Sequence, residues 1–313
     1  MEVLILGGTG AMGAPVVQIL ADRNNHVVVT TRQNKKSQNK YIQFVRGDAH
    51  DLNFVKGLLV KPYDAVIDFM IYTPDEFVTF SKLYMEKSRQ YVFLSSARVY
   101  ADSPKARITE DTPRLLDVTK DEQYLATNEY ALAKAREENV LTESGFNNFT
   151  IIRPYITYYN NRLQLGIFEK EIWLQRALEG KKIVFSRSIA SKYTTLTYGY
   201  DVALRIADLV GKDCALGKAY HITTEECIKW EDVLECYLDV LEQHTGKRPE
   251  VCWTEKSDPH LEKTNYYQIH CEREFDRRFS NAKIQADSGE QQAFMETKQG
   301  LEKCLTEFLN EEK

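Results

Sequence analysis

The chain has 313 residues, enough for about two domains of roughly 150 residues each and for a sizeable buried core. Hydrophobic residues make up 43%, aromatic residues 11% and charged residues 28% of it, a composition that excludes a disordered or fibrous chain. With 41 Lys and Arg against 46 Asp and Glu, the formal net charge of -5 argues against a surface that coats nucleic acid, but it leaves room for a local basic pocket that binds a small anion.

The N-terminus and the cysteines indicate a cytoplasmic protein. The first six residues lead directly into a glycine cluster, without the basic and apolar parts of a secretion signal. An apolar stretch of about 18 residues, as a transmembrane helix needs, is absent. The cysteines all lie in the second half, and no pair has the close spacing of a zinc or redox site. We therefore expect free thiols, no metal site and no membrane partner.

Short β-branched runs alternate with helical stretches along the first half of the chain. Strands are predicted at 3–6, 26–31, 42–46, 65–69, 91–94 and 149–152, with a helix near 16–20 and a longer one over 121–144, ended by Gly145. Strands separated by helices of this length imply right-handed crossovers and a parallel sheet covered on both faces. The predicted fold class is therefore α/β, with a doubly wound parallel sheet.

The pattern becomes irregular after Pro154. Helices are predicted over 162–180, 199–209, 230–244 and 291–309, and their apolar stripes are most simply core-facing. No internal repeat or flexible linker separates the two parts. We expect residues 1–160, joined by part of 190–222, to form one domain, and residues 161–313 to form a smaller α/β C-terminal lobe that binds the substrate.

Three glycines at a period of three follow the first predicted strand and precede the first helix. A tight turn there needs a residue that tolerates positive φ, and close approach of the backbone to a pyrophosphate leaves no room for a Cβ. The helix N-terminus adds oriented N–H groups for the anion. The motif alone also fits a purely structural turn, but its place between strand and helix favours a bound dinucleotide. The candidate residues of this loop are Gly7, Thr9, Gly10, Ala11, Met12 and Gly13.

Tyr130 and Lys134 lie four residues apart on the predicted long helix, so their side chains share one face. Such a pair also arises by chance in a chain of this composition, but no other tyrosine here has a lysine four residues after it. Ser96 follows the predicted strand 91–94, and ligands bind at the carboxyl ends of parallel strands. A phenol, with a usual pKa of about 10, needs a nearby cation to serve as a base at neutral pH.

Together these motifs resemble the extended short-chain dehydrogenase/reductase family, also called NAD-dependent epimerase/dehydratases, over about the first 155 residues. They are Gly-x-x-Gly-x-x-Gly from Gly7, Ser-Ser-x-x-Val-Tyr ending at Tyr100, and Tyr-x-x-x-Lys from Tyr130. The glycine that commonly follows Tyr100 is Ala101 here. The resemblance implies a Rossmann-type domain and a catalytic triad in which Tyr130 moves the proton, Ser96 holds the same substrate oxygen, and Lys134 stabilises the phenolate and binds the nicotinamide ribose. It also implies cofactor contacts at Asp48, Phe69, Pro154, Tyr155 and Ile156.

The end of the second predicted strand bears on the choice between NAD and NADP. An acidic residue at that place binds the ribose 2′-hydroxyl of NAD. Here the strand ends in Thr31 and Arg32, with Lys35 and Lys36 following. Arg32 could pair with a 2′-phosphate, so NADP is favoured over NAD unless Arg32 is only an exposed loop charge. Asp48 would contact the adenine amine by the resemblance, but it could equally be a turn or cap residue.

The residues after Ser96 bear on the reaction. The 4,6-dehydratases of the family carry an Asp-Glu pair just after the catalytic serine or threonine, whereas Ala97 and Arg98 stand there in this chain. A 4,6-dehydratase is therefore not expected. The remaining activities implied by the resemblance are epimerisation and reduction of a keto-sugar, both usually on nucleotide-activated sugars.

Other positions bear on the substrate. Thr194 stands where many members of the family place an arginine on the nucleotide diphosphate, which argues against a nucleotide-diphosphate substrate unless Arg187 or Lys192 replaces that arginine. Three acidic residues in the segment before Tyr130 are candidates for sugar hydroxyls, or equally parts of a solvated loop: Asp102, Glu110 and Asp111.

A cofactor-binding regulatory or RNA-binding protein of the same fold is the alternative function. The stretch 64–69, together with Thr31 and Arg32, resembles a chloroplast RNA-binding branch. Such regulators often lose the tyrosine or the lysine, whereas Tyr130 and Lys134 are both present, and the overall charge is acidic. We therefore expect an enzyme with a small-molecule substrate and no nucleic-acid partner, and leave a homodimer open.

Overall fold

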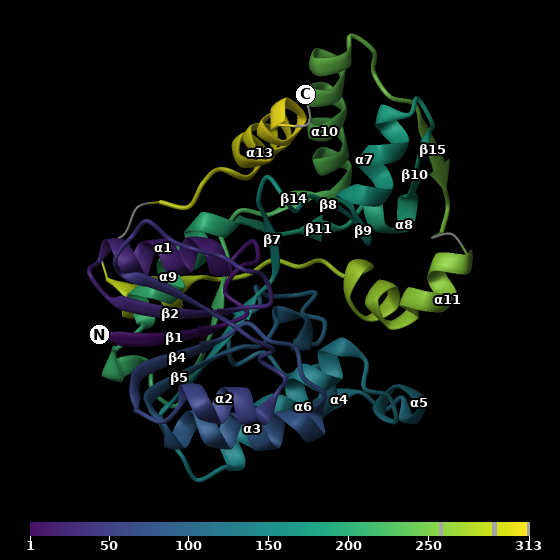
Figure 1. The fold of residues 1–313 in the computed structure, drawn as a ribbon. Coiled ribbons are helices and arrows are strands. Elements are labelled where there is room, and N and C mark those ends of the chain that lie inside the picture. The colour runs from purple at the N-terminus through teal and green to yellow at the C-terminus, as the bar shows by residue number, and fades with distance from the viewer. Residues whose placement is uncertain (257–258, 290–292, 312–313) are drawn as a thin grey trace.

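A seven-stranded parallel sheet organises the part of the chain that the computed structural model describes, residues 1–256, 259–289 and 293–311 (Figure 1). The strand order is β13-β6-β5-β4-β1-β2-β3, and every neighbouring pair is parallel. The predicted α/β fold is confirmed, with β13 as a strand that the local pattern did not predict. The strands are β1 (Glu2–Leu6), β2 (His26–Thr31), β3 (Ile42–Arg46), β4 (Tyr63–Asp68), β5 (Ser88–Leu94), β6 (Phe149–Pro154) and β13 (Lys218–Ile222).

Helices cover both faces of the sheet because successive side chains of its strands are apolar on both sides. Val3 and Ile5 of β1 pack with helices on one face, and Leu4 and Leu6 pack with helices on the other. Figure 1 shows α1 and α9 on one side of the sheet and α2, α3 and α6 on the other. The carboxyl ends of the strands remain as the edge where a ligand can bind. The covering helices are α1 (Gly13–Asp22), α9 (Gly199–Leu209) and α12 (Ala282–Ser288) on the first face, and α2 (Leu52–Leu58), α3 (Pro74–Glu86) and α6 (Tyr130–Glu143) on the second.

The C-terminal part has a core of its own, in which the rings of Trp173 and Tyr237 stack with centroids 4.4 Å apart. The same cluster includes Val99 and Tyr100, so this core packs directly against the carboxyl end of the sheet. The boundaries of the two predicted domains, 1–160 and 161–313, stay a prediction. The larger helices here are α7 (Lys170–Leu178), α10 (Trp230–Thr245) and α13 (Thr297–Glu311).

Small two-stranded sheets and short helices complete the described part of the chain. The paired strands are β7 (Ile156–Tyr158) with β12 (Leu196–Tyr198), β8 (Gln164–Leu165) with β9 (Phe168–Glu169), β10 (Ile183–Ser186) with β15 (Val251–Thr254), and β11 (Tyr193–Thr194) with β14 (Ile228–Lys229). The other helices are η1 (Ala97–Val99), α4 (Leu115–Val118), α5 (Glu122–Leu125), α8 (Arg187–Ala190), η2 (Asp213–Ala215), α11 (Pro259–Gln268) and η3 (Ile269–Arg273).

The predicted single helix over 121–144 is wrong, because two caps divide it. Asp121 accepts a hydrogen bond from the Tyr124 N–H and begins the short α5. The extended backbone of Glu129 then interrupts the helix, and its carboxylate accepts from the Ala131 N–H at the start of α6. Tyr130 is therefore the first residue of a helix rather than a residue in the middle of one.

The predicted helix over 162–180 is also wrong in its first half. Gly166 adopts a positive φ of 59° and turns the chain between β8 and β9, so that only 170–178 is helical. The predicted helix over 291–309 corresponds to α13, which begins at Thr297. Residues 291 and 292 of that prediction lie outside the described residues.

Candidate active site

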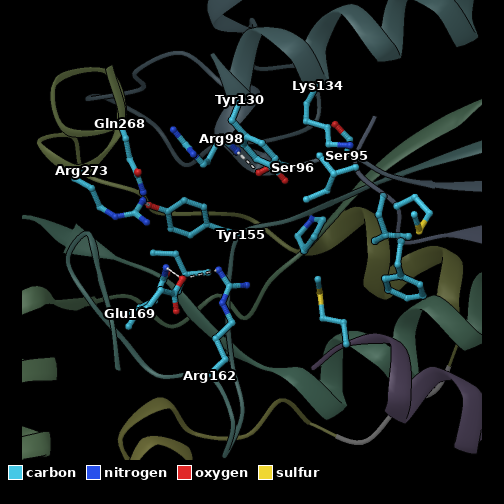
Figure 2. Close-up of a pocket in the computed structure, with 18 residues that line it drawn as sticks. Ser95, Ser96, Arg98, Tyr130, Lys134, Tyr155, Arg162, Glu169, Gln268 and Arg273 are labelled. Carbon is cyan, nitrogen blue, oxygen red and sulfur yellow. Dashed lines mark hydrogen bonds and ion pairs between the residues drawn. The ribbon is translucent and has the colours of Figure 1, made fainter. Parts of the chain in front are cut away.

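A cavity of about 410 Å³ opens where β4, β5 and β6 end, and it brings together residues from widely separated segments (Figure 2). All three predicted catalytic residues, Ser96, Tyr130 and Lys134, line it. Figure 2 shows them on one side, with Arg162 and Glu169 across the cavity and Arg273 at one end. Besides Lys134, five of the predicted cofactor contacts line the same cavity: Met12, Phe69, Pro154, Tyr155 and Ile156.

Ser96 is fixed by the turn that follows β5. Its extended backbone precedes η1, and its Oγ accepts a hydrogen bond from the Arg98 N–H at 3.2 Å. The neighbouring Ser95 hydroxyl donates to Glu138 at 2.6 Å. Both serines are largely buried, with exposed fractions of 3% for Ser95 and 7% for Ser96. This turn holds the Ser96 hydroxyl at the cavity wall.

Helix α6 supplies Tyr130 and Lys134 from consecutive turns. The Arg98 guanidinium lies 5.2 Å from the centre of the Tyr130 ring and forms an ion pair with Glu129 at 2.6 Å. The Lys134 side chain is only 2% exposed, and its ammonium donates to Glu137 at 2.8 Å. The phenol ring of Tyr130 thus has a cation fixed over it, and Lys134 has a buried counter-ion.

A second buried acid, Asp68, lies at the end of β4. Its carboxylate accepts hydrogen bonds from the Met70 N–H at 3.0 Å and from the Tyr91 hydroxyl at 2.8 Å. Burial raises the pKa of Asp68 to about 7, while Lys134 acts in the opposite direction. Burial likewise raises the pKa of Glu137, opposed by Lys134. Sequence reasoning missed both acids, although a carboxylate ending an apolar strand was the available signal for Asp68.

A network of charged side chains ties α6 to the sheet beneath the cavity. Glu138 accepts two hydrogen bonds from Arg153 of β6, at 2.7 and 2.8 Å, and one from Arg114 at 3.3 Å. Arg153 also donates to the Tyr100 hydroxyl at 3.0 Å. Glu138 and Arg153 are both buried, and each charge has a partner, as burial of ions requires. Through Ser95, the network reaches the turn that carries Ser96.

The glycine loop between β1 and α1 has the shape of an anion cradle. Gly7 adopts a φ of 68°, and its N–H donates to the Thr30 hydroxyl at 3.1 Å. A Cβ on Gly13 would lie 2.7 Å from the Gly8 Cα, whereas a Cβ on Gly10 would meet no protein atom within 4 Å. Helix α1 has no side-chain cap and no acidic residue in its first turn. These features fit the pyrophosphate of a dinucleotide, bound over Gly10 at the helix N-terminus.

The remaining predicted cofactor residues lie farther along the sheet and are not among those that line the cavity. Thr9, Gly10 and Ala11 belong to the glycine loop. Thr31 ends β2, and its hydroxyl accepts from the Gln33 N–H, while Arg32 is exposed. Asp48 follows β3, is exposed, and accepts from the His50 N–H at 3.0 Å in a local turn.

The other end of the cavity is lined by Arg98 and by five groups that the sequence did not single out. The five are Arg162, Gln164, Glu169, Gln268 and Arg273. Arg162 pairs with Glu169 at 3.2 Å, and the buried Glu272 accepts from both Tyr155 and Arg273. Only the folded chain brings these residues together, since α6, the β8–β9 hairpin and the segment at 268–273 are distant in the sequence.

Several candidates for substrate contacts lie elsewhere. Thr194 is buried in β11, and neither Arg187 nor Lys192 is among the residues that line the cavity. Arg187 instead pairs with Glu255 at 3.5 Å. Asp102, Glu110 and Asp111 are also outside the cavity lining, and Glu110 accepts from the His221 N–H at 3.0 Å.

All six cysteines are free. Within the described residues, no group of His, Cys, Asp and Glu side chains could hold a metal ion, and no helix is long and apolar enough to cross a bilayer.

Solved structures with the same fold cover nearly the whole chain. UDP-glucuronic acid 4-epimerase from Bacillus cereus, in complex with UDP-glucuronic acid and NAD, matches with a TM-score of 0.72 and 15% identity over 100% of both chains. WbmH from Bordetella bronchiseptica, in complex with NAD+, matches with a TM-score of 0.70 and 18% identity over 99% of this chain and 98% of its own. dTDP-glucose 4,6-dehydratase from Bacillus anthracis, in complex with NAD, matches with a TM-score of 0.69 and 16% identity over 100% and 97%.

Sequence comparisons give one match. No curated protein matches the chain significantly. The model of a family described as NAD(P)H-binding matches residues 7–171, which include the glycine loop, Ser96, Tyr130 and Lys134. Because that match spans more than half of the chain, this protein belongs to the NAD(P)H-binding family.

Proposed function

We propose that this protein is an NAD(P)-dependent epimerase or reductase that acts on a hydroxyl or keto group of a sugar, in the form of a nucleotide-sugar. The observation that carries the proposal is the shared cavity: Ser96, Tyr130 and Lys134 line it together with Met12 from the end of the glycine loop. A candidate acid/base and a candidate dinucleotide site therefore meet in one place.

The three catalytic candidates have distinct tasks. When bound, a nicotinamide dinucleotide supplies the hydride acceptor or donor. The Tyr130 phenolate takes the proton from a substrate hydroxyl, or the Tyr130 phenol gives its proton to a carbonyl oxygen, and the Ser96 hydroxyl holds the same oxygen by a hydrogen bond. The Lys134 ammonium favours the phenolate form of the tyrosine, since an adjacent cation stabilises the anion. Lys134 is also the residue that would bind the nicotinamide ribose.

The polar end of the cavity supports a hydroxylated, anionic substrate. Arg98, Arg162 and Arg273 present guanidinium groups, and Gln164 and Gln268 present amide groups, to the same space. Guanidinium and amide groups together suit phosphate and sugar hydroxyls. The Bacillus cereus epimerase of the same fold was solved with UDP-glucuronic acid, which is compatible with this substrate class.

A 4,6-dehydratase activity has less support. Ala97 is fully buried, and Arg98 is held by Glu129 and Glu272, so these two positions offer no free acid and base to remove water. Keto-sugar reduction needs one proton from Tyr130, and epimerisation needs Tyr130 to take a proton and give it back, so neither requires a second acid/base pair. We therefore propose one of these two reactions.

The test of the function is turnover. The protein, incubated with NAD(H) or NADP(H) and a panel of nucleotide-sugars, is expected to give an epimerised or reduced product that NMR detects. Tyr130→Phe should lower kcat by about 100-fold or more while cofactor affinity stays within about twofold, because the phenol moves the proton. Wild-type kcat in this variant would refute the role of Tyr130. Cofactor binding without turnover of any substrate would instead favour a regulatory role.

We propose NADP(H) as the preferred cofactor, on the basis of Arg32 at the end of β2. The solved structures named above contain NAD, so the preference needs a direct test. NADPH should bind more tightly than NADH, and Arg32→Glu should weaken NADPH binding about tenfold or more by removing the cation and adding an anion beside the 2′-phosphate. Calorimetric titration of both nucleotides measures this. Equal or tighter binding of NADH to the wild type would contradict the preference.

A further inference from the structure

Two buried acids, Glu137 and Asp68, lie close to the Lys134 ammonium, although the proposed role of Lys134 needs neither. Its ammonium group donates to the Glu137 carboxylate at 2.8 Å, and the side chains of both residues are at most 2% exposed. The other oxygen of Glu137 is buried and has no hydrogen-bond partner. A buried carboxylate with a free oxygen is costly unless a cation holds it, so Lys134 is what keeps Glu137 in place as an anion.

Other groups face this pair from the neighbouring elements. Asp68 of β4 interacts electrostatically with both Lys134 and Glu137, and the Phe93 ring of β5 lies 4.7 Å from the ammonium. Tyr91 of β5 donates to Asp68. The ammonium therefore lies among an aromatic ring and two acids, and not in solvent.

Glu138 and the nearby arginines form ion pairs with residues other than Lys134 and Glu137. Glu138, the next residue on α6, is paired with Arg153 and Arg114. Arg98, over the Tyr130 ring, is paired with Glu129. Of the acids around Lys134, Glu137 is thus the one hydrogen-bonded to its ammonium, and Asp68 is the other acid close enough to act on it.

We propose that Glu137 is a positioning residue for Lys134: it fixes the ammonium at the cavity wall, and its charge offsets the pull of that ammonium on the Tyr130 phenol. The electrostatic effect of Lys134 on the phenol is consequently smaller than that of a lysine without this counter-ion. The inference rests on the proposed role of Tyr130 as the acid/base.

The experiment is a titration of the Tyr130 phenolate by its ultraviolet absorption, in the folded protein without cofactor. The spectrum of each protein minus that of its Tyr130→Phe counterpart isolates this one tyrosine. Glu137→Gln should lower the titration midpoint by about one pH unit, the effect of one unit charge removed at close range inside a protein. Glu137→Leu, which also suits a buried site, should lower it in the same direction and serves if the glutamine variant does not fold.

One background and one control make the result decisive. Asp68 can replace the lost counter-ion, so the comparison is repeated in Asp68→Asn, where the full downward shift is expected. Glu143→Gln removes the same charge from an exposed position on α6 and should leave the midpoint unchanged.

A midpoint that stays or rises on Glu137→Gln in the Asp68→Asn background would overturn the proposal. So would an equal downward shift on Glu143→Gln, since the effect would then not depend on the place of the charge beside Lys134. Because the titration needs no substrate, its result is separate from the turnover test of the proposed function. In the active enzyme, the acid limb of the kcat/KM profile should move to lower pH together with the titration midpoint.

Discussion

Among single residues, Asp68 has the clearest effect of burial on a charge. The folded chain removes its carboxyl group from solvent at the end of β4, and this raises its pKa from 3.8 to about 7. The protonated form is thus favoured in the folded state, and the folded protein holds a proton that the unfolded chain has already released. The stability that protonated Asp68 contributes to the folded state is therefore fully present below about pH 4 and is lost as the pH rises through about 7.

Asp68→Asn should remove this pH dependence, because the amide is neutral throughout. We expect the free energy of unfolding of the wild type, relative to the variant, to fall by at least about 1 kcal/mol between the two ends of this pH window, since one pKa unit corresponds to about 1.4 kcal/mol. Urea unfolding of both proteins at each pH measures the difference. Parallel stability curves for the two proteins would contradict the assignment.

At the scale of elements, the turn from β1 to α1 contains a glycine needed for packing, Gly13, and a glycine that leaves space for a ligand, Gly10. Gly13→Ala places a Cβ 2.7 Å from the backbone of Gly8 and should cost about 2 kcal/mol of stability. Gly10→Ala meets no protein atom within 4 Å, so its stability should stay within about 0.5 kcal/mol of the wild type. Its methyl group instead occupies the space of the pyrophosphate, and cofactor affinity should fall about tenfold or more. Thermal unfolding and nucleotide titration of the two variants test this; a Gly10→Ala variant that binds normally would exclude the cradle.

Local sequence patterns predict the glycine loop and the Tyr130–Lys134 pair, but not the start of α6 or the burial of Glu137. The glycine loop and the Tyr130–Lys134 pair are visible because each signal lies within a few neighbouring residues. The start of α6 was missed because Glu129, usually a good helix former, acts here as a cap. Glu137 reads locally as one more polar residue on a helix, and only the packing of α6 against β4 and β5 buries it beside Asp68.

For the molecule as a whole, the sheet is completed by a segment that lies far along the chain. β13 pairs with β6, and α9 packs beside α1 in the same buried cluster. Without them, every residue of β6 that is now buried would lie at an open sheet edge, which favours aggregation. A fragment of residues 1–160 should therefore aggregate or unfold without cooperativity, whereas residues 1–224 should be more soluble. Light scattering and thermal unfolding of the fragments check this; a soluble 1–160 that unfolds cooperatively would show that the first part folds alone.

The placement of the aromatic core also has a spectroscopic consequence. All three tryptophans, at 173, 230 and 253, belong to the C-terminal part. The Trp230 ring lies 5.8 Å from the guanidinium of Arg273, which lines the cavity. Tryptophan emission therefore comes from the C-terminal part alone, since the glycine loop contains no tryptophan. A ligand that contacts Arg273 changes the surroundings of Trp230, whereas one confined to the glycine loop does not, so emission can distinguish a ligand in the cavity from one bound only at the glycine loop.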